Sequence, residues 1–257
     1  MAFPNHRDSE AVIKTPEEIE LLARAGQILS GIVKDLKRSL KVGMTTQDLD
    51  LKAQELIASY QVTPAFKGYR GFPGCICVSV NEEVVHGIPG KRVIKEGDVV
   101  SIDIGIMVQD YFSDTAFTIG LGNISADLRT LLGVTQEALY KGIEQAVIHH
   151  HLSDISFAIQ SYVESHDFTV VRDFVGHGIG RRLHEYPEVP NFGPPHTGPL
   201  LKEGMVLAIE PMVNMGTWQT EILADGWTVV TKDRKPSAHF EHTVAVTKLG
   251  PRILTEW

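Results

Sequence analysis

The strongest constraint on the fold is an internal repeat at a constant offset of 107 residues. Lys95–Asp103 (KEGDVVSID) matches Lys202–Glu210 (KEGMVLAIE) without a gap. A His-Gly-Ile tripeptide precedes each copy, at His86 and at His177, and two helix-like segments precede each tripeptide. This common order of features predicts two related α+β halves, approximately residues 14–122 and 123–257. Because no Pro- or Ser-rich linker separates the halves, we expect them to pack as one domain over residues 1–257.

Capping signals predict a pair of helices in the first half. Thr15, followed by a proline and two glutamates, is typical of a helix start, and a helical apolar period continues to about Leu40. Thr45, with an acidic residue three positions later, opens a second helix that reaches Ser59 or Tyr60.

The second half shows the same order. Ser125 caps a helix that we expect to run to the tract of three histidines, residues 149–151. Ser153 or Asp154 caps another helix that reaches about Ser165. Consecutive residues of a helix point about 100° apart, so three such histidines cannot share one ion without distortion. We interpret the tract as a polar helix C-terminus.

Two predicted strands carry carboxylates. Apolar residues alternate with small or polar ones from Val100 to Ile106, which indicates a strand with one apolar face. A second strand, 111–119, would follow a tight turn at 108–109, and in that register Asp103 lies opposite Asp114. Directly opposed side chains are ~5 Å apart, so two such carboxylates need a shared proton or a cation. From this pair alone, exposed carboxylates in a register slipped by one residue remain an alternative.

The second copy of the repeat favours a metal centre. Glu210 takes the place of Asp103 in an otherwise apolar segment, where a lone carboxylate is costly to bury unless it is coordinated or hydrogen-bonded. Glu241 precedes a further apolar strand, and His177 lies between two glycines. With Asp114, these residues form a five-ligand, oxygen-rich set. Such a set suits two divalent first-row ions that share bridging carboxylates about 3.5–4 Å apart.

Composition excludes several classes of protein. Of the 257 residues, 43% are hydrophobic and 22% are charged, which is too apolar for a disordered chain. No apolar run approaches the ~20 residues of a membrane-spanning helix, and the net charge of -8 disfavours nucleic acid as a partner. The first eight residues contain no apolar block of the signal-peptide type, and two cysteines cannot build a disulfide framework. We therefore expect a cytoplasmic protein.

Six motifs follow one another in a specific order. They are Asn81–Pro89 (NEEVVHGIP), Asp103, Asp114-Thr115, Gly176–Glu185 (GHGIGRRLHE), Ile209–Pro211 (IEP) and Phe240–Thr243 (FEHT). In order, spacing and residue type they resemble type I methionine aminopeptidases, over nearly the whole chain. The resemblance implies the pita-bread fold, an α+β architecture whose two pseudo-symmetric halves, with antiparallel sheet flanked by helices, enclose a dinuclear metal centre. It also implies a hydrolase that removes the N-terminal methionine from nascent proteins and peptides and prefers a small second residue.

The resemblance assigns a role to each candidate ligand. It implies that Asp103 chelates one ion, that His177 ligates the other, and that Asp114 and Glu241 bridge the two. Glu210 would bind on the His177 side and accept a proton from the water that attacks the substrate. Two divalent ions per chain are implied, drawn from Co, Mn, Fe or Zn.

Two further histidines and a pocket follow from the same resemblance. His184 would donate a hydrogen bond to the substrate carbonyl, and His86 would assist the departing nitrogen. The alternative for an isolated histidine is a structural ring satisfied by backbone groups. Some bacterial members have a cysteine where this chain has Phe66, and an aromatic residue where it has Leu183. The methionine side chain would be bound by Tyr69, Phe72, Cys77, Leu183 and Trp227.

Two alternatives share the fold. One is a prolidase or aminopeptidase P, which acts on X-Pro peptides and usually carries an added N-terminal domain. The other is a non-catalytic binding module, in which metal ligands are typically lost. The insertion of type II enzymes does not occur between His177 and Glu241, which favours the short bacterial-type form. We expect a monomer that meets the N-terminal methionine of nascent polypeptides, with transient ribosome association as a further option, and neither a membrane nor a specific nucleic acid as partner.

Overall fold

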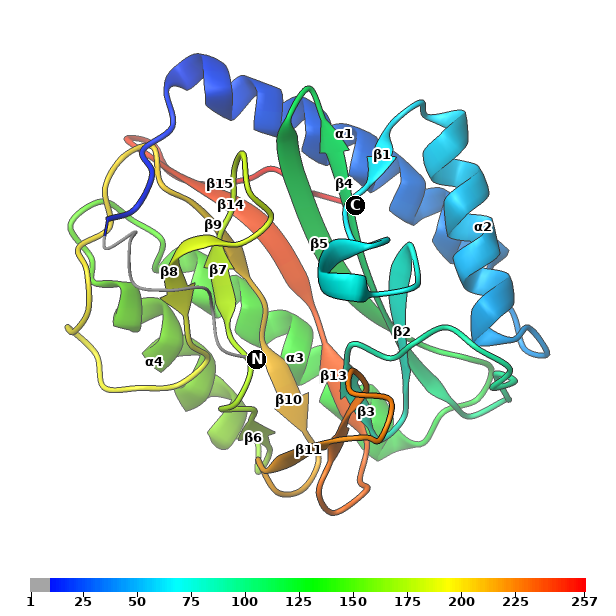
Figure 1. Cartoon of the computed structure of the whole chain (residues 1–257). Coiled ribbons are helices and arrows are strands. Elements are labelled where there is room, and N and C mark those ends of the chain that lie inside the picture. Colours follow the sequence, from blue (N-terminus) through cyan, green and yellow to red (C-terminus); the bar gives the residue numbers. More distant parts are fainter. Residues whose placement is uncertain (1–9) are drawn as a thin grey trace.

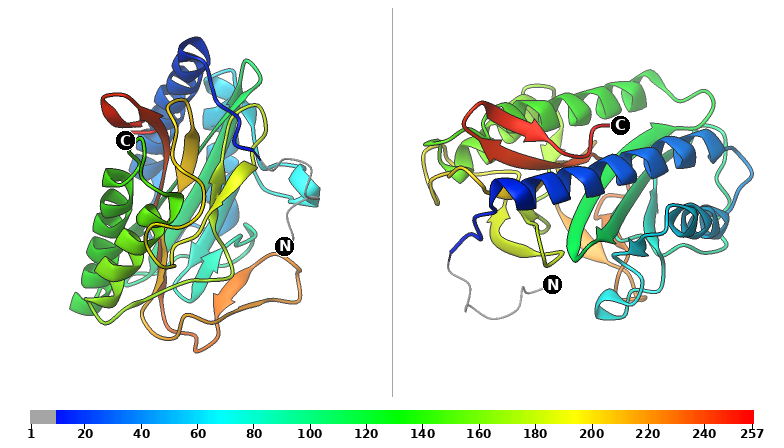
Figure 2. Two further views of the ribbon diagram at one scale, coloured as in Figure 1. Left: turned by 90° about the vertical axis from the view of Figure 1, so that its left-hand side faces the viewer. Right: turned by 90° about the horizontal axis from the view of Figure 1, so that it is seen from above.

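The computed structural model describes residues 10–257 (Figure 1). A central antiparallel sheet has helices packed against one face, and the left view of Figure 2 shows α3 and α4 on one side of the strands. No helix in the described range is long and apolar enough to cross a membrane. The first eight residues, on which the signal-peptide prediction depends, lie outside the described residues.

The first two helices begin where their capping signals predict. The side chain of Thr15 accepts from the backbone N–H of Glu18, and Thr45 makes the equivalent bond with Asp48. In both cases the acidic side chain bonds back to the N–H of the cap. The two helices are α1 (Pro16–Ser39) and α2 (Thr46–Ser59).

The second helix pair differs from the prediction at the join between its helices. Helix α3 (Ala126–Glu144) is capped by Ser125 as predicted, but it ends well before the histidine tract. Helix α4 (Leu152–Glu164) begins after His151, whose backbone N–H donates to Asp154 at 2.8 Å. The prediction of Ser153 or Asp154 as the cap is therefore wrong, because Asp154 occupies the third helical position. The three histidines lie in the connection between the helices.

Most strands belong to one sheet. In this nine-stranded sheet the order is β1-β4-β5-β14-β9-β7-β8, with β2 also paired to β4 and β15 to β14. Its strands are β1 (Thr63–Pro64), β2 (Ile76–Val80), β4 (Val99–Val108), β5 (Tyr111–Gly120), β7 (Gly176–Gly178), β8 (Glu185–Val189), β9 (Val206–Ile209), β14 (Glu241–Thr247) and β15 (Gly250–Ile253). Two three-stranded sheets hold the rest: β13 (Ser237–His239), β10 (Met212–Asn214) and β6 (Thr169–Val170), then β11 (Thr220–Ile222), β12 (Val229–Thr231) and β3 (Glu83–Val85).

The internal repeat has a structural counterpart. Strands β4 and β9 begin at matched positions, and the matched glycines before them, Gly97 and Gly204, have φ values of +90° and +87°. The residue after each glycine donates its backbone N–H to the carbonyl of the lysine that begins the repeat. These bonds, Asp98 to Lys95 and Met205 to Lys202, are both 3.2 Å long. Equivalent residues therefore build an equivalent left-handed turn into an equivalent strand. The division of the chain into two halves as such stays a prediction.

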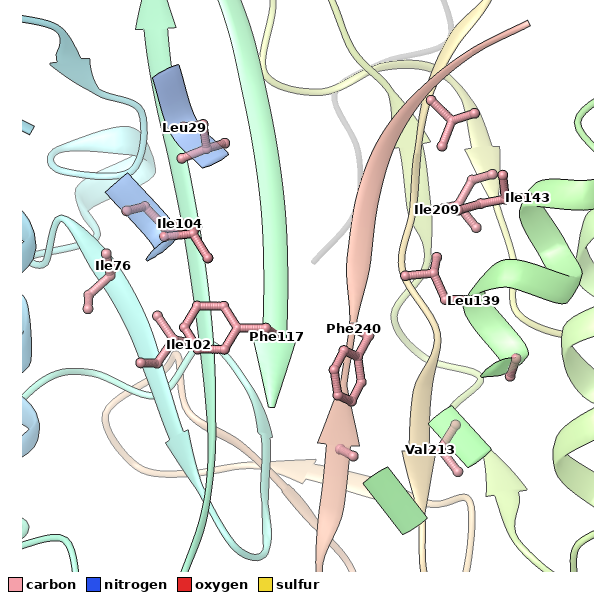
Figure 3. Close-up of a cluster of buried hydrophobic side chains, with 14 of the residues drawn as sticks. Leu29, Ile76, Ile102, Ile104, Phe117, Leu139, Ile143, Ile209, Val213 and Phe240 are labelled. Atoms are coloured by element: carbon pink, nitrogen blue, oxygen red, sulfur yellow. The ribbon is translucent and has the colours of Figure 1, made fainter. Parts of the chain in front are cut away.

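Alternation along β4 separates the core from the opposite face of the sheet. Ile102 and Ile104 are fully buried and belong to the same apolar cluster as Leu29 of α1 and Leu139 of α3 (Figure 3). Successive strand residues point to opposite faces, so Asp103 points away from the helices. The helix-covered face supplies the main core, and the other face remains for polar side chains.

The register of the β4–β5 hairpin differs from the prediction by two residues. Val108 pairs with Tyr111, and the two-residue turn is Gln109-Asp110, with φ values of +49° and +65°. Asp103 therefore pairs with Ala116, and Asp114 pairs with Gly105, so the two carboxylates are diagonal neighbours and not directly opposed. A shift of two residues, unlike a shift of one, keeps both side chains on the same face.

Candidate metal centre

The five predicted ligands come from neighbouring strands. Asp103 lies on β4, Asp114 on β5, Glu241 at the start of β14 and His177 on β7. Glu210 directly follows Ile209, the last residue of β9. These five strands are consecutive in the sheet, which brings together residues that are far apart in the chain.

All predicted site residues line one cavity. Besides the five candidate ligands, it is lined by both predicted catalytic histidines, His86 and His184. Phe66 and Leu183, where the chain departs from some family members, also line it. The predicted pocket residues on its wall are Tyr69, Phe72, Cys77 and Trp227.

The donor atoms fit divalent cations. One ligand atom each of Asp114, His177 and Glu241 lies within 4.8 Å of the others. Three buried carboxylate oxygens, Asp103 Oδ1, Asp114 Oδ1 and Glu241 Oε1, have no hydrogen-bond partner among the described residues. Buried polar atoms are normally satisfied, so unpaired oxygens at one place indicate a missing positive partner. Carboxylates with one imidazole suit first-row divalent ions.

Electrostatics lead to the same interpretation. Burial raises the pKa of Asp114 to about 7. Burial, together with the charge of Asp114, also raises the pKa values of Asp103, Glu210 and Glu241. Ionising four buried carboxyl groups in one cavity costs free energy, and near neutral pH this cost destabilises the metal-free protein. A bound dication removes this cost by compensating their charge.

His177 is oriented as a metal ligand would be. Its Nδ1 lies 2.9 Å from the carbonyl oxygen of Gly178, and its Nε2 lies 3.7 Å from Oε1 of Glu210. Burial lowers the pKa of His177 to about 4, so its ring is neutral at pH 7. A backbone partner at one ring nitrogen, with the other nitrogen facing the ion, is the usual arrangement of ligating histidines.

The two other histidines border the cavity in different ways. His184 has its Nδ1 2.9 Å from the hydroxyl oxygen of Tyr69, and burial lowers its pKa to about 2. His86 packs edge-on against Phe174 and Trp227, with ring centroids 5.6 and 6.2 Å away, and burial lowers its pKa to about 4. Both rings are neutral at pH 7 and can each donate one hydrogen bond.

An apolar wall adjoins the candidate ligands. The rings of Phe72 and Trp227 meet edge-on at 5.1 Å, and Leu183 is buried in the same cluster. Cys77 pairs with Asp103 across β2 and β4, and burial raises the pKa of its thiol. An apolar, aromatic wall of this kind suits a thioether side chain.

Sequence reasoning missed several residues in and next to the cavity. His239 does not line it but is buried behind Glu210, with its Nε2 3.4 Å from Oε2 of that residue. Its position two residues before Glu241 is the only signal that could have suggested it. Phe174 and Val175 directly precede the Gly176–Glu185 motif, so an extension of that motif would have included them. The other missed lining residues are Arg70, Val85, Asp173 and Met212.

A family model decides the classification of this fold and site. The model described as metallopeptidase family M24 matches residues 20–248. The chain belongs to metallopeptidase family M24. It is therefore a member of a family of peptidases that use divalent metal.

Relatives within family M24 are closely similar along the whole match. Methionine aminopeptidase 1 of Bacillus subtilis is 54% identical over 244 residues, which cover 95% of this chain and 98% of that protein. The crystal structure of methionine aminopeptidase from Thermotoga maritima superposes with a TM-score of 0.94 at 45% identity, covering 96% of this chain and 100% of that one. The resemblance to bacterial-type methionine aminopeptidases and the expectation of a metalloaminopeptidase are confirmed.

A prolidase has the same fold as this M24 member. Prolidase from Pyrococcus furiosus superposes with a TM-score of 0.78 at 24% identity, covering 96% of this chain but 66% of that one. The pita-bread fold predicted from the sequence is thus confirmed, while the X-Pro peptidase alternative is not favoured.

Proposed function

We propose that this chain removes the N-terminal methionine from peptides and nascent proteins, with a preference for a small second residue. The observation that carries the proposal is the convergence of five candidate ligand side chains, on or directly after five adjacent strands, beside an apolar pocket. The similarity to a methionine aminopeptidase at 54% identity supports it. The pocket would bind the methionine side chain, which leaves the scissile carbonyl over the carboxylates.

Two divalent ions per chain fit the donor set. Asp103 would hold one ion and His177 the other, with Asp114 and Glu241 between them and Glu210 on the His177 side. Such ions supply Lewis acidity and lower the pKa of water. Glu210 would accept the proton of the attacking water at a carboxylate oxygen.

The neutral histidines act on the substrate. His184 would donate a hydrogen bond to the carbonyl oxygen, where negative charge develops as water attacks. His86, with its ring held against Phe174 and Trp227, would face the nitrogen of the scissile bond and assist its departure. The apolar wall formed by Phe72 and Trp227 would exclude water from the methionine side chain.

The setting of the reaction is part of the proposal. We place the protein in the cytoplasm as a monomer that meets nascent chains, with transient ribosome association. A reducing compartment suits Cys75 and Cys77, which are buried free thiols.

Cleavage of a short peptide tests the proposed activity. After reconstitution with Mn, Fe, Co or Zn, the protein should release methionine from Met-Ala-Ser and leave X-Pro peptides intact. Asp103→Asn and Glu241→Gln, which keep the size of the side chain, should abolish turnover. Turnover of X-Pro peptides alone would support the prolidase alternative, and no peptidase activity with any metal would support a binding module.

A further inference from the structure

Two histidines of the site lie side by side but have different kinds of hydrogen-bond partner. The ring centroids of His177 and His184 are 4.3 Å apart. The Nδ1 of His177 meets the carbonyl oxygen of Gly178, an atom that can only accept. The neutral ring of His177 must therefore carry its proton on Nδ1, which leaves a lone pair on Nε2.

The Nδ1 of His184 meets a different chemical group. It lies 2.9 Å from the hydroxyl oxygen of Tyr69, a group that can donate. When the hydroxyl donates to Nδ1, the single proton of the neutral His184 ring is on Nε2. The ring of His184 then has a donor at Nε2, whereas the ring of His177 has a lone pair there.

Tyr69 is held in place, so that its hydroxyl stays beside Nδ1 of His184. It begins a 3-10 turn, η1 (Tyr69–Gly71), in which its N–H donates to the carbonyl of Phe66 at 2.9 Å and its carbonyl accepts from Phe72 at 2.9 Å. Its ring stacks on that of His184, with centroids 5.3 Å apart and planes 23° apart. The guanidinium of Arg70 lies 5.4 Å from the same ring.

We infer that Tyr69 is a positioning residue that fixes His184 as the Nε2–H tautomer, so that two adjacent histidines hold opposite tautomers. His177 presents a lone pair to the metal centre, and His184 presents an N–H to the substrate. The same bond keeps His184 from competing as a ligand, since its Nε2 carries a proton. This inference rests on the function proposed above and adds to the pocket role of Tyr69.

Nitrogen NMR of the histidine rings tests the tautomers directly. In wild-type protein labelled with 15N-histidine and loaded with diamagnetic Zn²⁺, the spectrum should show His184 protonated at Nε2 and His177 protonated at Nδ1. In Tyr69→Phe, His184 should become a mixture of both tautomers, while His177 stays unchanged. A wild-type His184 that is protonated at Nδ1 would overturn the inference, and this measurement needs no variant to fold.

Kinetics separate positioning from lining the pocket. Tyr69→Phe should lower kcat for Met-Ala-Ser roughly tenfold, as loss of a supporting hydrogen bond typically does, with KM changed less than about twofold. In a His184→Ala background the same substitution should cost nothing further, because Tyr69 acts through His184. A raised KM with unchanged kcat, or an equal loss in both backgrounds, would overturn the inference.

A matched control is available. The hydroxyl of Tyr60 donates to the carboxylate of Asp35 on α1 at 3.2 Å, and neither residue lines the cavity. Tyr60→Phe removes this hydroxyl and should leave kcat unchanged. The two proposals can fail separately. Wild-type protein that shows the expected tautomers but cleaves no Met-Ala-Ser would contradict the proposed function, whereas active protein with an unchanged His184 tautomer in Tyr69→Phe would contradict only the inference.

Discussion

Asp103 and Asp114 lie diagonally across the β4–β5 hairpin, because their direct partners are Ala116 and Gly105. Diagonal neighbours on one face are about 7–8 Å apart at Cα, against ~5 Å for opposed residues. Gly105 keeps the space beside Asp114 open, since a Cβ there would lie 3.2 Å from Asp114 Oδ1 and 2.9 Å from the ring of Phe66. The hairpin therefore leaves room between its two carboxylates, as the proposed metal centre requires.

Removal of one central carboxylate should have opposite effects on metal binding and on the stability of the metal-free protein. We expect Asp114→Asn to weaken metal binding at least about 100-fold, measured by calorimetry. Without metal at pH 7.5, the variant should be more stable by on the order of 1 kcal/mol in urea unfolding, because burial raises the pKa of Asp114 to about 7. Asp110→Asn, in the exposed turn of the same hairpin, should change neither quantity. Equal metal affinity in both variants would contradict the assignment.

The stability of the metal-free protein should fall as pH rises from about 4 to about 7. The carboxyl of Asp114 has an ordinary pKa near 4 when unfolded and about 7 when folded, so the native state holds more protons in this interval. More protons in the native state mean that the free energy of unfolding decreases with pH. Thermal unfolding should show this decrease, and added divalent metal should raise Tm more at pH 7.5 than at pH 5. A rise in the stability of the metal-free protein across this range would contradict the buried carboxylate cluster.

Loss of the substrate-facing imidazole should affect chemistry and leave metal binding intact. We expect His184→Ala to lower kcat about 10²–10³-fold, the usual effect of removing one donor to a developing oxyanion. Metal affinity should stay at the wild-type value, because His184 is not a ligand in the proposed site. His166→Ala, at an exposed residue just beyond the end of α4, is the matched control. If metal binding collapsed in His184→Ala, the ring would have to be reassigned as a ligand.

A buried ion pair holds the segment that follows His184. Lys14 Nζ lies 2.7 Å from Glu185 Oε2, and both side chains are 3% exposed. Lys14→Met leaves an uncompensated buried carboxylate, so we expect a loss of about 3–5 kcal/mol in urea unfolding. Lys52→Met breaks the exposed pair with Glu55 and should cost less than about 1 kcal/mol. Similar losses in the two variants would show that the buried pair contributes little.

The matched glycines of the repeat should tolerate alanine unequally. Both have left-handed φ values, so either substitution should cost about 1 kcal/mol or more in the free energy of unfolding. Gly204→Ala should cost more, because its Cβ would lie 2.6 Å from the backbone oxygen of Lys14. The nearest atom to a Cβ at Gly97 is 3.9 Å away. Urea unfolding of both variants measures the ranking, and a larger loss for Gly97→Ala would contradict it.

Local signals predicted the parts of the fold that local interactions determine. The two N-caps Thr15 and Thr45 satisfy backbone N–H groups within four residues, so the sequence alone is sufficient to place them. The start of α4 was missed because Asp154 resembles an N-cap but serves as the third helical residue, bonding back to His151. An acidic residue at either position gives the same sequence pattern.

The register of the β4–β5 hairpin is set by its turn, whose residues are not typical of a two-residue hairpin turn. The turn Gln109-Asp110 has positive φ at both residues, a conformation usually marked by Asn-Gly or Asp-Gly. Because this stretch contains no glycine, nothing in the sequence favours a turn at Gln109-Asp110 over the predicted turn at 108–109. The candidate ligands nevertheless line one cavity, since an error of two residues leaves Asp103 and Asp114 on the same face.

The two faces of β4 serve different purposes: one packs against the helices and the other faces the candidate metal centre. The even-numbered positions from Val100 to Ile106 are fully buried in the apolar cluster beneath the helices, and the intervening odd-numbered positions include Asp103. Randomised libraries confined to the odd positions of β4 could therefore search for new metal preferences or substrates while every side chain that anchors the helices stays in place.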